Sequence, residues 1–164
     1  MNATIRLARQ EDAEAILAIY QPYIEHSAFS FETVVPTVAE FWNRISKVLE
    51  TASWLVCAID DNIVGYAYAS PHRYRAAYGW NREVSVYVHP NYRRRKVAKA
   101  LYTTLIELSK LQGYTNLLAG IVLPNPPSIA FHQSTGFQLI GTYHNVGYKF
   151  GQYHDTQWWE LFIG

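Results

Sequence analysis

The 164-residue sequence contains one cysteine, Cys57, and little charge, since Asp, Glu, Lys and Arg make up only 16% of it. A lone cysteine excludes an intrachain disulfide and a cysteine-based zinc site, and the six histidines show no metal-ligand spacing. No apolar run approaches the ~18 residues of a membrane span, and residues 1–9 lack the continuous apolar stretch of a signal peptide. These absences predict a cytoplasmic protein that binds neither a metal nor a membrane.

The composition that is present indicates a folded domain. Hydrophobic residues make up 49% of the chain, and no repeat, low-complexity stretch or Pro/Gly/Ser linker divides it. We therefore expect a single domain over residues 1–164. A net charge of +1 argues against a general nucleic-acid binder. Thirteen tyrosines and five tryptophans are typical of a ligand cleft or a subunit interface.

Hydrophobic periodicity predicts a mixed α/β (α+β) architecture. Strands are expected over 4–7, 54–59, 63–70, 83–88, 116–122, 137–143 and 156–163, and helices over 10–23, 37–49, 97–112 and 128–135. Pro22 is expected to bend or end the first helix, and Asp60-Asp61-Asn62 predicts a hairpin turn. The resulting order βααβββαβαββ favours a mixed sheet flanked by helices.

A run of four cations, Arg93-Arg94-Arg95-Lys96, lies between a predicted strand and the helix that starts near Val97. The N-terminus of a helix presents unpaired backbone N–H groups and a partial positive charge, so it suits a phosphate or pyrophosphate. A run of this kind is often only a solvated basic face. Its position at a strand-to-helix junction favours an anionic ligand.

Glu83 is the candidate general base. Strand alternation places Glu83, Ser85 and Tyr87 on one face of the predicted strand, and Val84 with the alternate valines on the other. A carboxylate on this strand could serve as a base in a partly dry cleft. The alternative is a solvated carboxylate at a strand edge.

Several segments together resemble the GCN5-related N-acetyltransferases (GNAT), and more closely their phosphinothricin and methionine sulfoximine acetyltransferase branch. They are EVSVYVHP at 83–90, RRRKVA at 93–98, LPNPPS at 123–128, HQSTGF at 132–137 and GYKFGQYHD at 147–155. The resemblance covers essentially the whole chain. It implies a GNAT-type mixed sheet, acetyl-CoA as co-substrate, a small amine as partner and a homodimer.

The resemblance also implies roles for individual residues. Glu83 would take the ammonium proton through water, and His132 would protonate the leaving thiolate. The implied cofactor-binding residues are Val86, Tyr87, Val88, Arg94, Arg95, Lys96, Val97, Ala98, Lys99, Asn125 and Ser134. The implied substrate-binding residues are Phe31, Arg73, Tyr74, Arg75, Glu83, Val84 and Ser85. The expected reaction is acetyl transfer to the α-amino group of an amino-acid-like substrate, by direct attack in a ternary complex.

Three positions lack the glycine that the family's loop commonly has there, because Arg94, Lys96 and Ala98 occupy them. Glycine lets a backbone approach a phosphate closely, whereas added cations could form direct charge-assisted bonds. One alternative is therefore a non-catalytic module that senses acyl-CoA or binds a protein. A third interpretation, nucleic-acid binding through Arg93–Lys96, fits poorly with a chain that is not basic elsewhere. His132 could also be a core histidine, and Asn125 a turn residue.

Overall fold

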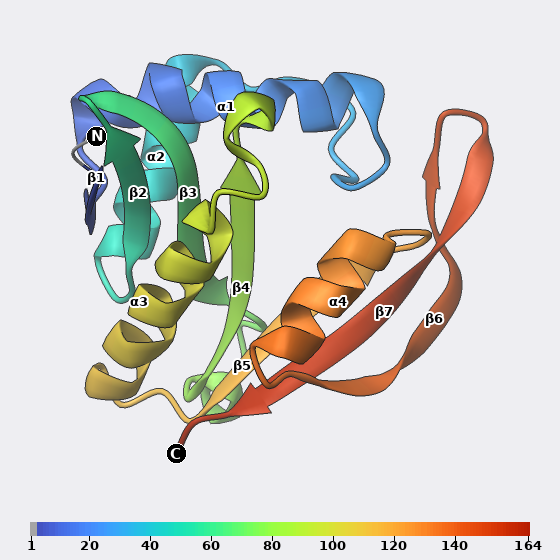
Figure 1. Cartoon of the computed structure of the whole chain (residues 1–164). Coiled ribbons are helices and arrows are strands. Elements are labelled where there is room, and N and C mark those ends of the chain that lie inside the picture. Colours follow the sequence, from blue (N-terminus) through green and yellow to red (C-terminus); the bar gives the residue numbers. More distant parts are fainter. Residues whose placement is uncertain (1–2) are drawn as a thin grey trace.

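The order of helices and strands predicted from the sequence is confirmed by the computed structural model, which describes residues 3–164 (Figure 1). Residues 1–2 of the predicted domain lie outside that part. The strands are β1 (Ala3–Leu7), β2 (Trp54–Ile59), β3 (Asn62–Pro71), β4 (Asn81–Val88), β5 (Asn116–Val122), β6 (Gln138–Lys149) and β7 (Gln152–Phe162). The helices are α1 (Ala13–His26), α2 (Val38–Leu49), α3 (Val97–Leu111) and α4 (Pro126–Ser134), with short 3₁₀ turns at Gln10–Asp12, Ala76–Tyr78 and Pro90–Tyr92.

Two predicted boundaries are wrong. Pro22 lies inside α1, which continues to His26 because Ile24 is buried beyond the proline. Strands β6 and β7 are several residues longer than expected and form a hairpin that turns at Phe150-Gly151, both at positive φ. Glycines at 141, 147 and 151, and the lack of a regular alternation of apolar and polar residues, hide the strand character of this hairpin.

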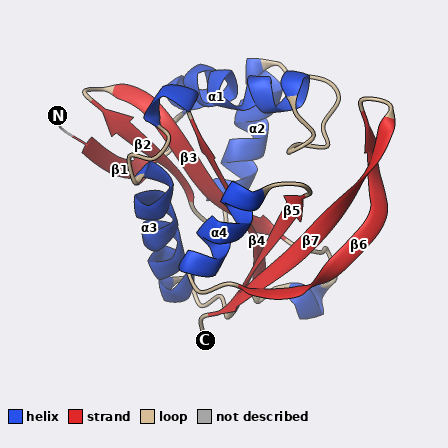
Figure 2. Ribbon diagram, turned by 45° about the vertical axis from the view of Figure 1, so that its right-hand side comes forward, coloured by secondary structure: helices blue, strands red, loops and turns tan. Residues whose placement is uncertain are grey.

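A seven-stranded sheet with the order β1-β2-β3-β4-β5-β7-β6 forms the centre of the fold. All neighbours are antiparallel except β4 and β5, which pair in parallel over only three positions, Asn81–Glu83 with Asn116–Leu118. Beyond Glu83 the two strands diverge, as Figures 1 and 2 show. The sheet therefore opens into a V at its centre, and β4 keeps one edge without a strand partner there.

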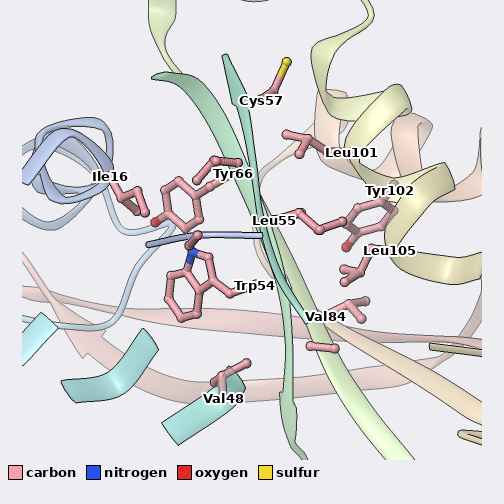
Figure 3. Packing of buried hydrophobic residues seen from close by; sticks show 14 of the residues in the cluster. Ile16, Val48, Trp54, Leu55, Cys57, Tyr66, Val84, Leu101, Tyr102 and Leu105 are labelled. Atoms are coloured by element: carbon pink, nitrogen blue, oxygen red, sulfur yellow. The ribbon is translucent and has the colours of Figure 1, made fainter. Parts of the chain in front are cut away.

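Helices cover both faces of the sheet. Helix α3 buries Leu101, Tyr102 and Leu105 against one face, where Leu55 and Val84 meet it (Figure 3). Helices α1 and α2 cover the other face, where Ile16 and Val48 lie on the side of Trp54 and Tyr66 (Figure 3). The predicted alternation in β4 is consistent with this arrangement, because Tyr87 packs against the aromatic side chains of α1. No helix within residues 3–164 is long and apolar enough to cross a membrane.

Candidate active site

A cleft of about 760 Å³ lies where β4 and β5 diverge. Its walls come from β4, β5, the loop before α3, and helices α1, α3 and α4. Predicted site residues that line it are Val84, Ser85, Val86, Tyr87, Val88, Arg94, Lys96, Val97, Ala98, Lys99, Asn125 and His132. The structure thus brings together most of the predicted cofactor residues, which come from three separate stretches of the sequence.

The loop before α3 adopts the backbone that glycines would favour. Arg94 has φ +61° and Lys96, at the N-cap of α3, has φ +63°. These left-handed conformations strain residues with a Cβ atom. Arg93 also lines the cleft, and its guanidinium donates a 3.1 Å hydrogen bond to the Tyr23 hydroxyl. Arg94 and Lys96 line the cleft with it, next to the open N-terminus of α3.

Two predicted cofactor residues lie outside the lining of the cleft. The Arg95 guanidinium lies over the Tyr92 ring, 5.3 Å from its centroid. Ser134 is exposed near the end of α4, and its hydroxyl donates to the Phe131 carbonyl at 2.7 Å. In this conformation neither side chain faces the space between β4 and β5.

His132 is buried in α4 and lines the cleft together with Tyr102 of α3. Its Nδ1 lies 2.8 Å from the Ser128 carbonyl, which can only accept, so Nδ1 carries the proton. Its Nε2 then accepts from the Tyr102 hydroxyl at 3.0 Å. Burial lowers the pKa of His132, and the Ser128 hydrogen bond partly offsets that effect. A neutral imidazole with both nitrogens occupied is therefore the resting state.

Asn125 begins α4 at the edge of the cleft. Its side-chain oxygen accepts from the Ser128 amide at 3.3 Å and so caps the helix. Pro126 and Pro127 fill the first helical positions, where no N–H is needed. The Asn125 amide NH₂ is left as a hydrogen-bond donor for a ligand in the cleft, so the capping and binding interpretations are compatible.

Glu83 lies at the point where β4 leaves β5, and its partner was not predicted. Its Oε2 is 3.3 Å from Nδ1 of His72, whose side chain is 14% exposed. Cross-strand pairing of Ser70 with Glu83 brings the following loop residue, His72, back over the carboxylate. The sequence signal for this contact is weak, because it depends on the register of β3 and β4.

The predicted substrate loop Arg73–Arg75 is exposed, and it lines neither the cleft described above nor the smaller cavity described below. Arg73 is tied indirectly to Glu83, because its Nε donates to His72 Nε2 at 3.4 Å. Tyr74 is fully exposed. The predicted pocket residue Phe31 instead lies over Gly147, where an added Cβ would come within 2.2 Å of its ring.

A second, smaller cavity of about 150 Å³ lies on the face of the sheet that α1 and α2 cover. It is lined by Tyr20, Glu32, Phe41, Arg44, Val48, Trp54, Tyr66, Tyr68 and Ser70. Tyr68 and Ser70 pair across β3 and β4 with Ser85 and Glu83. Ser85 lines the main cleft, so the two cavities meet neighbouring residues of β3 and β4, and Glu83 is next to this cavity through its pairing with Ser70.

Residues 5–158 match the family model described as an acetyltransferase (GNAT) domain. The chain is 35% identical over 156 residues to the phosphinothricin N-acetyltransferase of Streptomyces viridochromogenes, covering 95% of this chain and 85% of that one. It is 32% identical over 162 residues to the L-methionine sulfoximine/L-methionine sulfone acetyltransferase of Salmonella typhimurium, covering 96% and 93%. The crystal structure of a phosphinothricin acetyltransferase from Sinorhizobium meliloti in complex with acetyl-CoA superposes with a TM-score of 0.95 at 32% identity, covering 100% and 90%.

The fold, the cleft and these matches define the chain as an acetyl-CoA-dependent N-acetyltransferase of the GNAT family. Within that family it belongs to the phosphinothricin and methionine sulfoximine acetyltransferase branch. The resemblance stated from the motifs is confirmed.

Proposed function

We propose that the enzyme transfers the acetyl group of acetyl-CoA to the α-amino group of a small amino-acid-like acceptor, by direct attack in a ternary complex. Acetyl-CoA would occupy the cleft between β4 and β5, with its pyrophosphate at the N-terminus of α3. The names of the relatives support this class of acceptor. The cleft geometry supports direct transfer, because Glu83 directly precedes Val84 and Ser85 of the cleft wall, while the one cysteine of the sequence, Cys57, is buried in β2.

In this mechanism Glu83 removes a proton from the acceptor ammonium through a water molecule. The free amine attacks the thioester carbonyl and the C–N bond forms. The C–S bond then breaks, coenzyme A leaves as the thiolate, and the extra proton on the nitrogen passes through solvent to that thiolate, which gives the amide and free coenzyme A thiol. Backbone N–H groups of β4 near Tyr87 and Val88 would stabilise the developing oxyanion. Such donors are available because the backbone of β4 does not pair with β5 beyond Glu83.

We assign His132 a positioning role toward the leaving sulfur in place of direct proton donation. Its Nδ1 proton is bonded to the Ser128 carbonyl, and its lowered pKa disfavours the protonated form. The Tyr102 hydroxyl, which it holds at 3.0 Å, would turn to donate a hydrogen bond to the thiolate. Tyr102→Phe then lowers kcat more than it raises the KM for acetyl-CoA, measured by steady-state thiol release. An unchanged kcat in that variant would contradict the role.

The observation that carries the proposed function is the cleft itself, which joins the N-terminus of α3, Asn125 and the edge of β4 in one space. Calorimetric titration with acetyl-CoA, followed by an acetyl-transfer assay, tests it. Saturable binding with turnover supports the enzyme. Saturable binding without turnover on any amine would favour a sensing module, and no saturable binding would overturn acetyl-CoA recognition.

We also propose that two copies of the chain form a homodimer through the β6–β7 hairpin. This hairpin exposes an unusual number of large hydrophobic side chains, namely Leu139, Ile140, Tyr143, Val146, Tyr148, Phe150, Tyr153 and Phe162. Exposed apolar surface of this kind marks interaction sites. Light scattering should give twice the mass of 18.9 kDa. A monomer at micromolar concentration would contradict this assembly.

A further inference from the structure

The smaller cavity, at about 150 Å³, has room for the end of an amino-acid side chain. It lies beside the proposed base, because Ser70 of its wall pairs with Glu83 and Tyr68 pairs with Ser85. An acceptor whose amino group reaches the thioester past Glu83 can therefore extend its side chain into this space. The remaining question is which side chains the walls accept.

An ion pair between Arg44 and Glu32 determines the net charge at the cavity. Arg44 Nη1 of α2 lies 2.7 Å from Glu32 Oε1, and the Tyr20 hydroxyl donates to the same carboxylate oxygen at 2.9 Å. The two side chains are 48% and 32% exposed, so the pair lies at the mouth of the cavity. The positive charge of Arg44 is already balanced by Glu32, and it offers little net attraction to a second anion.

The inner walls are aromatic and carry no further charge. The indole of Trp54 lines the cavity, stacks on Tyr68 with 4.1 Å between ring centroids, and lies beside Tyr66 (Figure 3). The Trp54 residue is 3% exposed, and its Nε1–H has no hydrogen-bond partner within residues 3–164. A buried donor without a partner is costly. Nε1 itself is buried, however, so the wall that a ligand meets is the uncharged aromatic surface of these rings.

The neighbouring carboxylates add an unfavourable field for an anion. The pKa of Tyr68 is raised chiefly by burial and further by the negative charges of Glu83 and Glu32, while Ser85 and Arg44 lower it. Both carboxylates therefore act electrostatically on a side chain of the cavity wall.

We propose, resting on the function proposed above, that this cavity holds the end of the acceptor side chain and that the Glu32–Arg44 pair makes it select uncharged ends over anionic ones. The relatives leave this choice open, since they include enzymes named for phosphinothricin and for methionine sulfone. These two amino acids are a close steric match. Each carries two oxygens and a methyl group on the atom that ends the side chain, but the phosphinate of phosphinothricin is negatively charged and the sulfone is neutral.

The test compares kcat/KM for methionine sulfone and phosphinothricin at saturating acetyl-CoA. The wild-type enzyme should prefer the sulfone about tenfold, a modest factor because the ion pair is partly exposed. Glu32→Gln leaves Arg44 without its counter-ion while keeping a group that can accept from Tyr20. This variant should shift the ratio about tenfold toward phosphinothricin.

Arg44→Gln gives the opposite test, because it leaves Glu32 unpaired and should shift the ratio further toward the sulfone. Glu25→Gln is the matched control, since Glu25 is exposed on α1 and its loss changes the net charge by the same amount. The control should leave the ratio unchanged. Thermal melting of each variant shows whether it is folded.

Several outcomes would overturn the inference. If the wild-type enzyme prefers phosphinothricin, or if neither Glu32→Gln nor Arg44→Gln moves the ratio, the pair does not determine specificity. If both variants shift the ratio in the same direction, the effect is one of packing. A wild-type enzyme that binds acetyl-CoA but acetylates no amino acid would refute the proposed function itself, which is a separate result.

Discussion

Lys96 provides a sharp test of how the phosphate loop is built, because its backbone and its side chain have opposite effects. Its φ of +63° at the N-cap of α3 is a conformation in which a Cβ atom costs about 1 kcal/mol. Lys96→Gly should therefore raise the free energy of unfolding by about 1 kcal/mol, or the melting temperature by about 2–4 °C for a domain of this size. Differential scanning calorimetry without ligand measures this.

The same substitution removes a cation that lines the cleft. If Lys96 contacts the pyrophosphate directly, Lys96→Gly should weaken acetyl-CoA binding about five- to tenfold, the size of a partly exposed charge-assisted bond. It should also flatten the salt dependence of binding, since ionic contacts weaken as the Debye length falls from ~10 Å at 0.1 M salt to ~3 Å at 1 M. Isothermal titration at two salt concentrations gives both quantities.

Two further variants separate the backbone effect from the charge effect. Lys96→Gln keeps the strained backbone, so it should weaken binding without raising the melting temperature. Lys110→Gly introduces glycine at a helical, exposed position of α3, so it should lower the melting temperature and leave binding unchanged. A melting temperature that does not rise in Lys96→Gly would refute the strain argument. Tighter acetyl-CoA binding in that variant would show that Lys96 obstructs the loop.

Three other expectations follow from the site. Glu83→Gln should lower kcat about 10²–10⁴-fold and make the rate depend on the free-amine fraction, so activity should rise with pH in a pH–rate profile; an unchanged profile would contradict the base. Arg73→Ala or Arg75→Ala should raise the KM for amino acids about tenfold if these exposed side chains close over the acceptor carboxylate, with no such rise for a polyamine. His132 has a pKa lowered by burial from 6.5, so the unfolded chain binds its proton at higher pH than the folded one. The stability that neutral His132 contributes is complete above about pH 6.5 and is lost as the pH falls toward the lowered pKa of the folded state. Urea unfolding at several pH values measures this loss. His132→Asn should make the free energy of unfolding depend less on pH.

Local patterns were enough to predict the centre of the molecule. Alternation in β4 placed Glu83 and Tyr87 on one face, and the junction before Val97 placed the cations at a helix N-terminus. Both features depend only on residues that are close in sequence. For that reason the order of elements and most of the cleft lining could be anticipated.

Contacts between distant elements could not be predicted in the same way. His72 reaches Glu83 through the register of two strands, and Tyr102 reaches His132 from a different helix. The pairing of Arg44 with Glu32 depends on how α2 packs beside the segment that follows α1. A motif match was not enough to predict side-chain positions either. Arg73–Arg75 match a binding loop, yet their side chains are exposed in the structure.

The most direct test of the central claim is a thiol-release assay with acetyl-CoA and a panel of acceptors, run on the wild-type enzyme and on Glu83→Gln. The panel should contain free amino acids, methionine sulfoximine, methionine sulfone, phosphinothricin, polyamines and a lysine peptide. We predict rapid release with one or more of the amino-acid-like acceptors, little with polyamines or the peptide, and a large loss in the variant. Equal release from every amine, or release that is independent of Glu83, would contradict transfer to a selected α-amino group.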